Sequence, residues 1–211
     1  MFIIFTHTGN LIRLYCLETF QEWCCLTLKS KNLIMYNQKD KKFSFNYDKA
    51  VASLLFVTQH VHNLYNIVKV FYFADKKHLS KYGRFIFGDK YIAMKSGQVP
   101  SNIYDMIKFV RGDGSKEFDE SLNDLISVEN ENTIKAKSKP DLDYLSPSDI
   151  ECLRESIKKY GKIPPQKLLT ISHSDKAYQD TPRNNEIKLD KIIDTLGNKN
   201  KIKHYLNHLY D

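Results

Sequence analysis

The segment between Asn63 and Gly83 limits the possible folds more than any other part of the chain, because its apolar residues follow one helical face. They recur at intervals of three and four residues, the spacing that brings side chains together on one side of an α-helix. The apolar positions are Leu64, Ile67, Val68, Phe71, Tyr72 and Leu79. Gly83 tolerates the left-handed backbone conformation that ends many helices. The pattern predicts a helix that starts near Asn63, ends at Gly83 and buries one face against other elements.

Helical signals recur along the rest of the chain. Asn46 or Asp48 can cap a helix, and Pro100 opens another. Residues 146–149 read Ser-Pro-Ser-Asp, which places a capping serine before a first-turn proline and an acidic residue. That order predicts a firmly defined helix start. Further short helices are predicted at residues 164–172, 187–196 and 199–210.

One region between these helices has extended character. Residues 85–87 read Phe-Ile-Phe, residues 88–90 read Gly-Asp-Lys, and residues 91–94 read Tyr-Ile-Ala-Met. Aromatic and β-branched residues on both sides of a Gly-Asp turn predict short extended segments, arranged as a small hairpin. The predicted fold class is therefore mainly α: a compact helical domain with a small extended or hairpin element and an unassigned N-terminal extension.

The first 45 residues differ from the rest, because their apolar and aromatic patches lack both helical and alternating periodicity. They form strands, a partner-specific appendage, or an upstream extension of the reading frame that does not fold, and the pattern does not choose between these. The predicted organisation is an N-terminal extension of unknown structure (1–45), a main domain (46–196) and a basic C-terminal helix (197–211).

The formal net charge of +7 makes a nucleic-acid partner worth testing against the charge distribution. Residues 46–112 contain ten basic and four acidic residues, whereas residues 113–132 contain one basic and seven acidic residues. A dedicated nucleic-acid binder more often presents an uninterrupted basic face. A basic block followed by an acidic block can also steer a charged partner or fold back on itself. A nucleic-acid-binding regulator therefore stays as the alternative function, with binding that weakens steeply as salt rises.

Cysteine usage and hydropathy predict a cytoplasmic protein. The four cysteines, Cys16, Cys24, Cys25 and Cys152, form no C-x-x-C pair, so neither a zinc site nor a disulfide framework is indicated. Free thiols are typical of a reducing cytosol. The first residues are apolar but lack the basic region and the long apolar stretch of a signal peptide. No apolar run approaches the ~18 residues that a membrane span needs, so no membrane partner is expected.

Asp75 and His78 are the most informative polar residues, because they lie three apart on the predicted 63–82 helix. They form an acid–base dyad, contact a partner, or brace the turn at residues 88–91 through backbone hydrogen bonds. No serine or cysteine nucleophile lies in a recognisable elbow, and no glycine-rich phosphate loop precedes a helix. His204 and His208 are four apart on the C-terminal helix, but two histidines without a third ligand do not indicate zinc. We therefore expect no enzyme activity, no cofactor and no metal site.

A partner-binding surface is predicted near the turn at residues 97–101, which also starts the next helix. Tyrosine and arginine are favoured at binding hot spots, and several lie close by in the sequence. The candidate contact residues are Tyr72, Asp75, His78, Tyr82, Arg84, Tyr91, Gln98 and Tyr104.

Two longer runs resemble a known domain. Residues 69–84 read Lys-Val-Phe-Tyr-Phe-Ala-Asp-Lys-Lys-His-Leu-Ser-Lys-Tyr-Gly-Arg, and residues 88–104 read Gly-Asp-Lys-Tyr-Ile-Ala-Met-Lys-Ser-Gly-Gln-Val-Pro-Ser-Asn-Ile-Tyr. Together with Leu-Ser-Pro-Ser-Asp at 145–149 and Ile-Ser-His at 171–173, they are similar to the Panacea (SocA-like) domain. The likeness covers roughly residues 46–196. Gln98 departs from it, because the family usually has proline at that position.

The resemblance implies an antitoxin, encoded by a bacterium, phage or prophage beside a toxin. It implies a helical scaffold that neutralises a cognate toxin protein by binding it, and a protease as a further partner where neutralisation proceeds through degradation. It implies no catalysis. Against it stands the alternative of a nucleic-acid-binding regulator of phage or prophage origin.

Overall fold

The computed structural model of the chain describes residues 43–208, which lie within one compact unit, Lys42–Asp211. The predictions for residues 1–42, including three of the four cysteines, fall outside the described residues. The described part is mainly α-helical with two small antiparallel hairpins, which confirms the predicted fold class. Its helices are α2 (Tyr47–Thr58), α3 (Leu64–Tyr82), α4 (Ser101–Arg111), α5 (Leu122–Leu125), α6 (Pro147–Tyr160), α7 (Pro165–His173), α8 (Lys176–Gln179), α9 (Leu189–Asp194), α10 (Lys199–Asn207) and the 3-10 helix η1 (Leu142–Tyr144). Its hairpins are β1 (Tyr91–Met94) with β2 (Gly97–Pro100), and β3 (Ile126–Glu129) with β4 (Thr133–Ala136).

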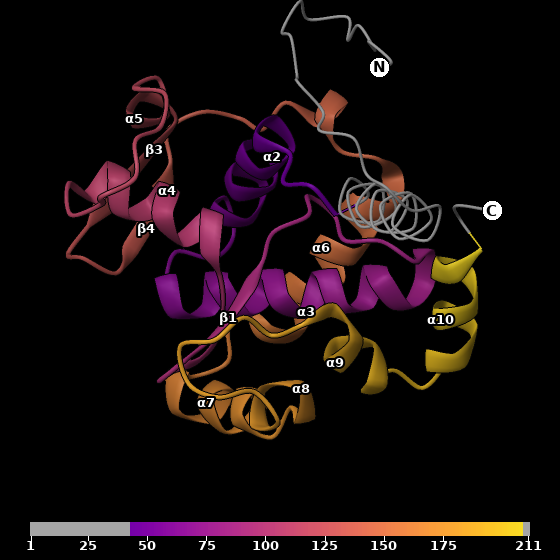
Figure 1. The fold of residues 1–211 in the computed structure, drawn as a ribbon. Helices are drawn as coiled ribbons and strands as arrows, with labels where there is room; N and C mark the ends of the chain where they lie inside the picture. The colour runs from indigo at the N-terminus through magenta and orange to yellow at the C-terminus, as the bar shows by residue number, and fades with distance from the viewer. Residues whose placement is uncertain (1–42, 209–211) are drawn as a thin grey trace, which may run out of the picture. The chain divides into compact units, whose positions relative to one another are not determined.

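Helix α3 occupies the middle of the fold, with α2 on one side and α7 and α8 on the other (Figure 1). Its start is fixed by Asn63, whose side chain accepts hydrogen bonds from the amides of Tyr65 and Asn66. Its end is Gly83, which has a positive φ of 69°. Both boundaries match the sequence prediction. The apolar face of α3 is fully buried against α6 and the β1–β2 hairpin.

Helix α6 starts with the predicted capping arrangement. The Ser146 side chain accepts from the Asp149 amide, and the Asp149 carboxylate accepts from the Ser146 amide. Further along, Cys152 and Leu153 are fully buried, and Ser156 Oγ donates to the carbonyl of Val70 on α3 at 2.7 Å. The two central helices are therefore joined by apolar packing and by a buried hydrogen bond.

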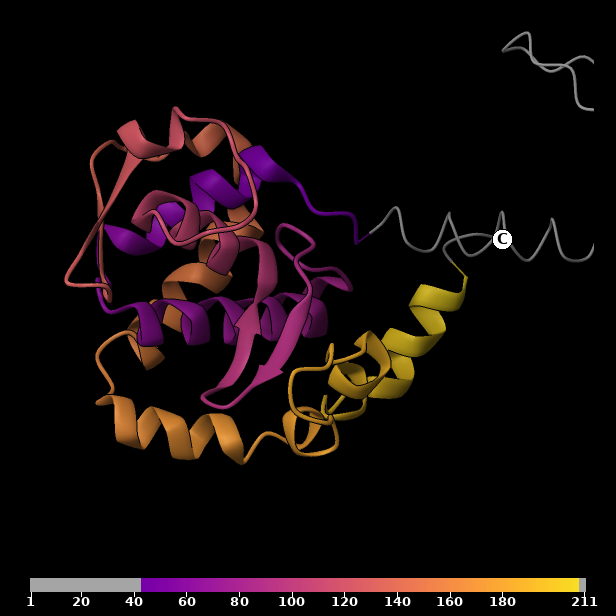
Figure 2. The same cartoon turned by 60° about the vertical axis from the view of Figure 1, so that its left-hand side comes forward.

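The first hairpin lies later in the chain than predicted. Its strands pair Tyr91 with Pro100 and Met94 with Gly97, so the chain turns at residues 95–96 and not at residues 88–90. Gly97 adopts a φ of 96°, and a Cβ there would lie 1.9 Å from Ser172 Oγ, so only glycine fits at the start of β2. The hairpin crosses α3 in Figure 2.

Asp89, which the prediction placed in a turn, caps α4 from a distance. Its carboxylate accepts from the backbone amides of Asn102 and Ile103, both at 3.0 Å. Pro100, the residue before α4, provides no side-chain cap. The amides of the first turn of α4, which have no partner within the helix, are thus satisfied by a buried carboxylate from another segment.

The second hairpin, β3–β4, and the short helices α5 and α8 were not predicted. The acidic, irregular segment at residues 115–135 hides a turn in which Asn130 and Glu131 both have positive φ. Ile126 and Ile134 from its two strands are fully buried. Few apolar residues anchor this hairpin, so the alternation of apolar and polar residues was too weak to predict its strands.

The C-terminal part of the described chain packs on the side of α3 that lies away from α2 (Figure 1). Helices α8 to α10 contribute to a second apolar cluster that includes Ala177, Ile192 and Ile202. The basic helix predicted as a separate element at 197–211 is α10, and it contacts α3 and α9 within the same compact unit. None of the helices that the structure describes is long and apolar enough to cross a membrane.

Candidate partner-binding surface at the start of helix α6

Asp75 and His78 are fully buried and do not pair with each other. Asp75 accepts from the Ile86 amide and from Tyr91 Oη, both at 2.7 Å. His78 Nδ1 lies 2.9 Å from the Arg84 carbonyl, and because a carbonyl only accepts, Nδ1 is the donor. No acid–base dyad is formed by these two residues. Both brace the segment between α3 and β1, which was the structural alternative in the sequence prediction.

Three further predicted contact residues also belong to the interior. Tyr72 Oη donates to Asp175 Oδ1 at 3.0 Å, and Gln98 Nε2 donates to the Ser172 carbonyl at 3.0 Å. Tyr91 is buried against Tyr72, with ring centroids 5.1 Å apart. A side chain without exposed surface cannot contact a partner in this conformation. Five of the eight predicted contacts, namely Tyr72, Asp75, His78, Tyr91 and Gln98, are therefore buried in this structure.

The exchange Asp75→Asn tests whether Asp75 is a buried group that supports the fold. Burial raises the pKa of Asp75 to about 7, although the hydrogen bonds from Ile86 and Tyr91 lower it. The folded protein therefore binds a proton that the unfolded chain releases between about pH 4 and 7, and the wild type loses stability as the pH rises through this window. The isosteric amide keeps an acceptor for the Ile86 amide, so we expect a folded variant that lacks this loss of roughly 1.4 kcal/mol per pH unit. Urea denaturation between pH 4 and 8 measures it, and a variant that unfolds at every pH would contradict it.

The three remaining candidates are partly exposed, and two of them meet at the start of α6. Tyr82, 40% exposed, donates its hydroxyl to Glu151 Oε2 at 2.7 Å. The Arg84 guanidinium lies 3.3 Å from Ser146 Oγ, and its side chain is 32% exposed. Tyr104 lies on α4, where Lys108 Nζ is 5.2 Å from its ring centroid. Of the predicted contact residues, Tyr82 and Arg84 thus belong to one partly exposed surface, and Tyr104 belongs to another.

A buried carboxylate, Asp149, holds this surface from below. Lys49 Nζ lies 2.6 Å from its Oδ2, while His78 Nε2 and Arg84 Nη2 approach its Oδ1 at 3.0 and 3.2 Å. The Arg84 contact is an ion pair that lacks well-aligned hydrogen-bond geometry. Burial alone would raise the pKa of Asp149, but its interactions with His78, Lys49 and Ser146 hold that pKa well below its ordinary value. Asp149 therefore ties α2, α3 and α6 together through its negative charge.

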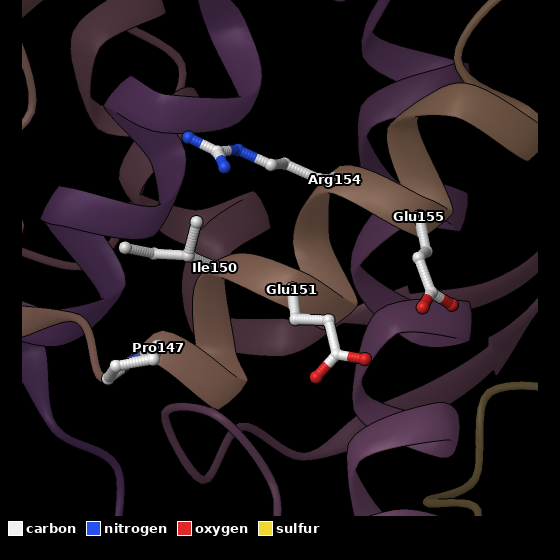
Figure 3. Close-up of a pocket in the computed structure, with 5 residues that line it drawn as sticks. All are labelled: Pro147, Ile150, Glu151, Arg154 and Glu155. Atoms are coloured by element: carbon white, nitrogen blue, oxygen red, sulfur yellow. The ribbon is translucent and has the colours of Figure 1, made fainter.

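A groove of about 430 Å³ opens beside this anchor and is lined by Pro147, Ile150, Glu151, Arg154 and Glu155 (Figure 3). Ile150 and Arg154 point towards α2, where the guanidinium lies 5.9 Å from the ring centroid of Phe56. Glu151 and Glu155 point to the α3 side, where they form ion pairs with Lys81 and Lys77. The groove is thus apolar in its middle and has a charge-balanced edge along α3.

Sequence reasoning did not find the groove, although a signal was present. Pro147, Ile150 and Arg154 recur at intervals of three and four on α6, but on the face opposite Cys152 and Leu153. An apolar residue on an otherwise polar helix face is common, so this pattern alone identifies no site. Among residues 43–208, no group of three or more His, Cys, Asp or Glu side chains is placed to hold a metal ion.

These features define a mainly helical scaffold protein in which most of the distinctive polar residues hold the fold itself. The chain belongs to the SocA-like antitoxin family: the family model described as "Antitoxin SocA-like, Panacea domain" matches residues 67–179, more than half of the chain. The match runs from α3 to α8 and includes the groove on α6. No curated protein and no solved structure matches the chain.

Proposed function

We propose that this chain is a cytoplasmic antitoxin that neutralises a cognate protein toxin by direct binding, without catalysis of its own. The observation that carries this proposal is the family match over residues 67–179. The geometry supports it in one further respect. The polar residues that suggested chemistry, Asp75 and His78, are held apart by scaffold hydrogen bonds, whereas the partly exposed Tyr82 and Arg84 contact Glu151 and Ser146 at the start of α6.

The charge distribution favours a protein partner over a nucleic acid. Of the ten basic residues between 46 and 112, seven form ion pairs with acidic residues and an eighth, Lys69, is fully buried. The paired residues are Lys49, Lys76, Lys77, Lys81, Arg84, Lys108 and Arg111. Phosphate binding needs cationic side chains that are free to neutralise phosphates and so to release the counterions condensed on the nucleic acid. The basic block therefore supports the fold more than it supports a nucleic-acid interface.

Co-expression with the adjacent reading frame tests the function. We expect the adjacent gene to arrest growth when it is expressed alone, and co-expression of this chain to restore growth. The two purified proteins should then elute as one complex. An adjacent product that is harmless alone would overturn the proposal, and rescue without a complex would favour a regulator that acts on nucleic acid.

The same strains separate inhibition from delivery to a protease. If binding alone neutralises the toxin, the toxin persists at a constant level after synthesis is stopped, and growth is still restored. If a protease is involved, the half-life of the toxin falls only when this chain is present. Leu153→Asp, which places a charge in the fully buried interior of α6, serves as the unfolded control in both measurements.

A further inference from the structure

We propose that η1 and the groove at the start of α6 form the docking surface for a basic partner protein, which under the proposed function is the toxin. The surface consists of Leu142, Tyr144, Pro147 and Ile150, with the acidic residues Asp141 and Asp143 at its η1 end. We call it the η1–α6 surface. It rests on the proposed function for the identity of the partner, but its location is argued from exposure, rigidity and charge.

Exposed apolar side chains are concentrated here. Leu142 is 46% exposed and Tyr144 is 49% exposed, the two largest values among the large apolar residues that the structure describes as exposed. Pro147 follows three residues later and begins the groove of about 430 Å³. Tyr82, also exposed, is held at the far side of α6 by Glu151. Exposed apolar side chains a few residues before an apolar groove suit a partner that both receives and inserts apolar groups.

The backbone of this surface is held in place by hydrogen bonds and by packing. The Asp141 side chain accepts from the Asp143 amide at 3.0 Å and caps η1. Leu145, directly after η1, is buried in the core, and Ser146 then enters the capping box of α6. The backbone that carries Leu142 and Tyr144 is thus fixed at both ends. A preorganised surface avoids much of the ordering cost of association.

Charge identifies the chemistry of the partner. On α6, Glu151 and Glu155 are paired with lysines of α3. No lysine, arginine or histidine within residues 43–208 forms an ion pair with Asp141 or Asp143, so both carboxylates are available to an outside cation. They flank the exposed side chain of Leu142. The complementary partner therefore presents lysine or arginine side chains around an apolar depression.

The same carboxylates disfavour other occupants. In a symmetric dimer this surface would pack on its own copy, and each copy would bring two carboxylates, those of Asp141 and Asp143, and only one groove-lining cation, Arg154, into the shared interface. Phosphate groups of a nucleic acid or of an anionic membrane would be repelled by the same two charges. A basic protein is the occupant for which the apolar and the charged features agree.

Binding between the full chain and the purified product of the adjacent gene tests the inference. We expect Tyr144→Lys and Asp143→Lys each to weaken the complex by at least about tenfold, because one removes an apolar anchor and both oppose a basic partner. Raising NaCl from about 0.05 to about 0.5 M should weaken the wild-type complex, and this salt effect should shrink in Asp143→Lys. Leu169→Lys on α7, where the leucine is 36% exposed, is the matched control and should bind like the wild type.

The outcomes separate the surface from the function. All variants carry exposed substitutions, so their thermal unfolding should match that of the wild type and exclude misfolding. A wild-type complex that survives unchanged in Tyr144→Lys and Asp143→Lys overturns the docking surface and leaves the antitoxin function standing. A wild-type chain that binds no adjacent product overturns both. A free chain that proves to be a dimer, dissociated by Tyr144→Lys, shows that the occupant is a second copy and also overturns the inference.

Discussion

Replacing Lys69 with methionine is expected to stabilise the protein below pH 7 and to lose this advantage as the pH rises towards 10. Lys69 lies on α3 and is fully buried. Its Nζ donates to the Gln98 carbonyl at 2.6 Å and lies 5.2 Å from the ring centroid of Tyr65, and no carboxylate forms an ion pair with it among the residues described. A buried ammonium group without a counter-charge is costly, because burial penalises the charged form.

The sign of the pH dependence follows from the direction of the shift. Burial lowers the pKa of Lys69 from its ordinary 10.5 to about 7. Between these values the unfolded chain holds a proton that the folded protein lacks, so the stability of the wild type rises with pH across this window. The full rise is about 4–5 kcal/mol, at roughly 1.4 kcal/mol per pH unit. Lys69→Met carries no titrating group, so the variant should not show this rise.

Urea denaturation of both proteins at pH 6, 8 and 10 measures the difference. Lys95→Met makes the same exchange at an exposed position and controls for the loss of one lysine from the unfolded chain. Parallel pH profiles for the wild type and Lys69→Met would show that Lys69 reaches solvent or a counter-charge in the folded protein, against the burial described above. A variant less stable than the wild type at pH 6 would show that the hydrogen bond to Gln98 outweighs the desolvation of the ammonium group.

Lys69 and Asp75 together predict an unusual profile for the wild type. The contribution of Asp75 to the free energy of unfolding falls as the pH rises from about 4 to 7, and the contribution of Lys69 rises between about pH 7 and 10.5. The combined contribution is therefore smallest near neutral pH. Two buried ionisable groups without ion pairs in the described part of the chain, both on α3, therefore lower the stability of the protein near neutral pH. A double variant Lys69→Met with Asp75→Asn should remove this minimum of stability.

Most of the helical framework could be predicted because its signals are local. Asn63, Gly83 and the Ser146–Asp149 capping box act within a few residues of the boundary that they set, so the sequence places those boundaries directly. The apolar stripe of α3 was equally readable, because a helix buried on one face repeats its pattern several times over its length. The family resemblance added the expected partner but no geometry.

The misplaced hairpin and the missed cap have the opposite cause, since both depend on contacts between distant segments. Asp89 looks like a turn residue in isolation, and only the fold brings it to the amides of Asn102 and Ile103. Glycine is required at the start of β2 because Ser172, far along the chain, leaves no room for a Cβ at position 97. The β3–β4 hairpin likewise has only a few buried residues to mark it.

The candidate contact residues show why polar residues on an apolar stripe are ambiguous. A polar residue on such a stripe either contacts another protein or forms hydrogen bonds within its own fold. The spacing of the residue in the sequence is the same in both cases. Asp75, His78 and Gln98 proved to be satisfied internally. Leu142 and Tyr144, for which the sequence analysis made no prediction, are exposed on the three-residue 3-10 helix η1.

Removal of the Asp149 carboxylate is expected to be among the most damaging single exchanges in the described chain. Asp149→Ala leaves the charges of Lys49 and Arg84 without their buried counter-ion and leaves the Ser146 amide without its acceptor. Breaking a buried ion pair from one side costs about 3–5 kcal/mol, because the partner charge stays desolvated. Glu151→Ala, on the same helix but with an exposed ion pair to Lys81, is the control and should unfold close to the wild type.

The acid limb of the stability curve distinguishes this electrostatic role from simple packing. The pKa of Asp149 lies below its ordinary 3.8 in the folded protein, so its contribution is complete above about pH 4 and is lost as the pH falls further. The isosteric variant Asp149→Asn keeps the volume but not the charge. We expect it to be several kcal/mol less stable than the wild type at pH 7, with the gap narrowing as the pH drops below 4. A gap that is the same at pH 7 and pH 3 would mean that shape and hydrogen bonding, and not the negative charge, hold α2, α3 and α6 together beneath the η1–α6 surface.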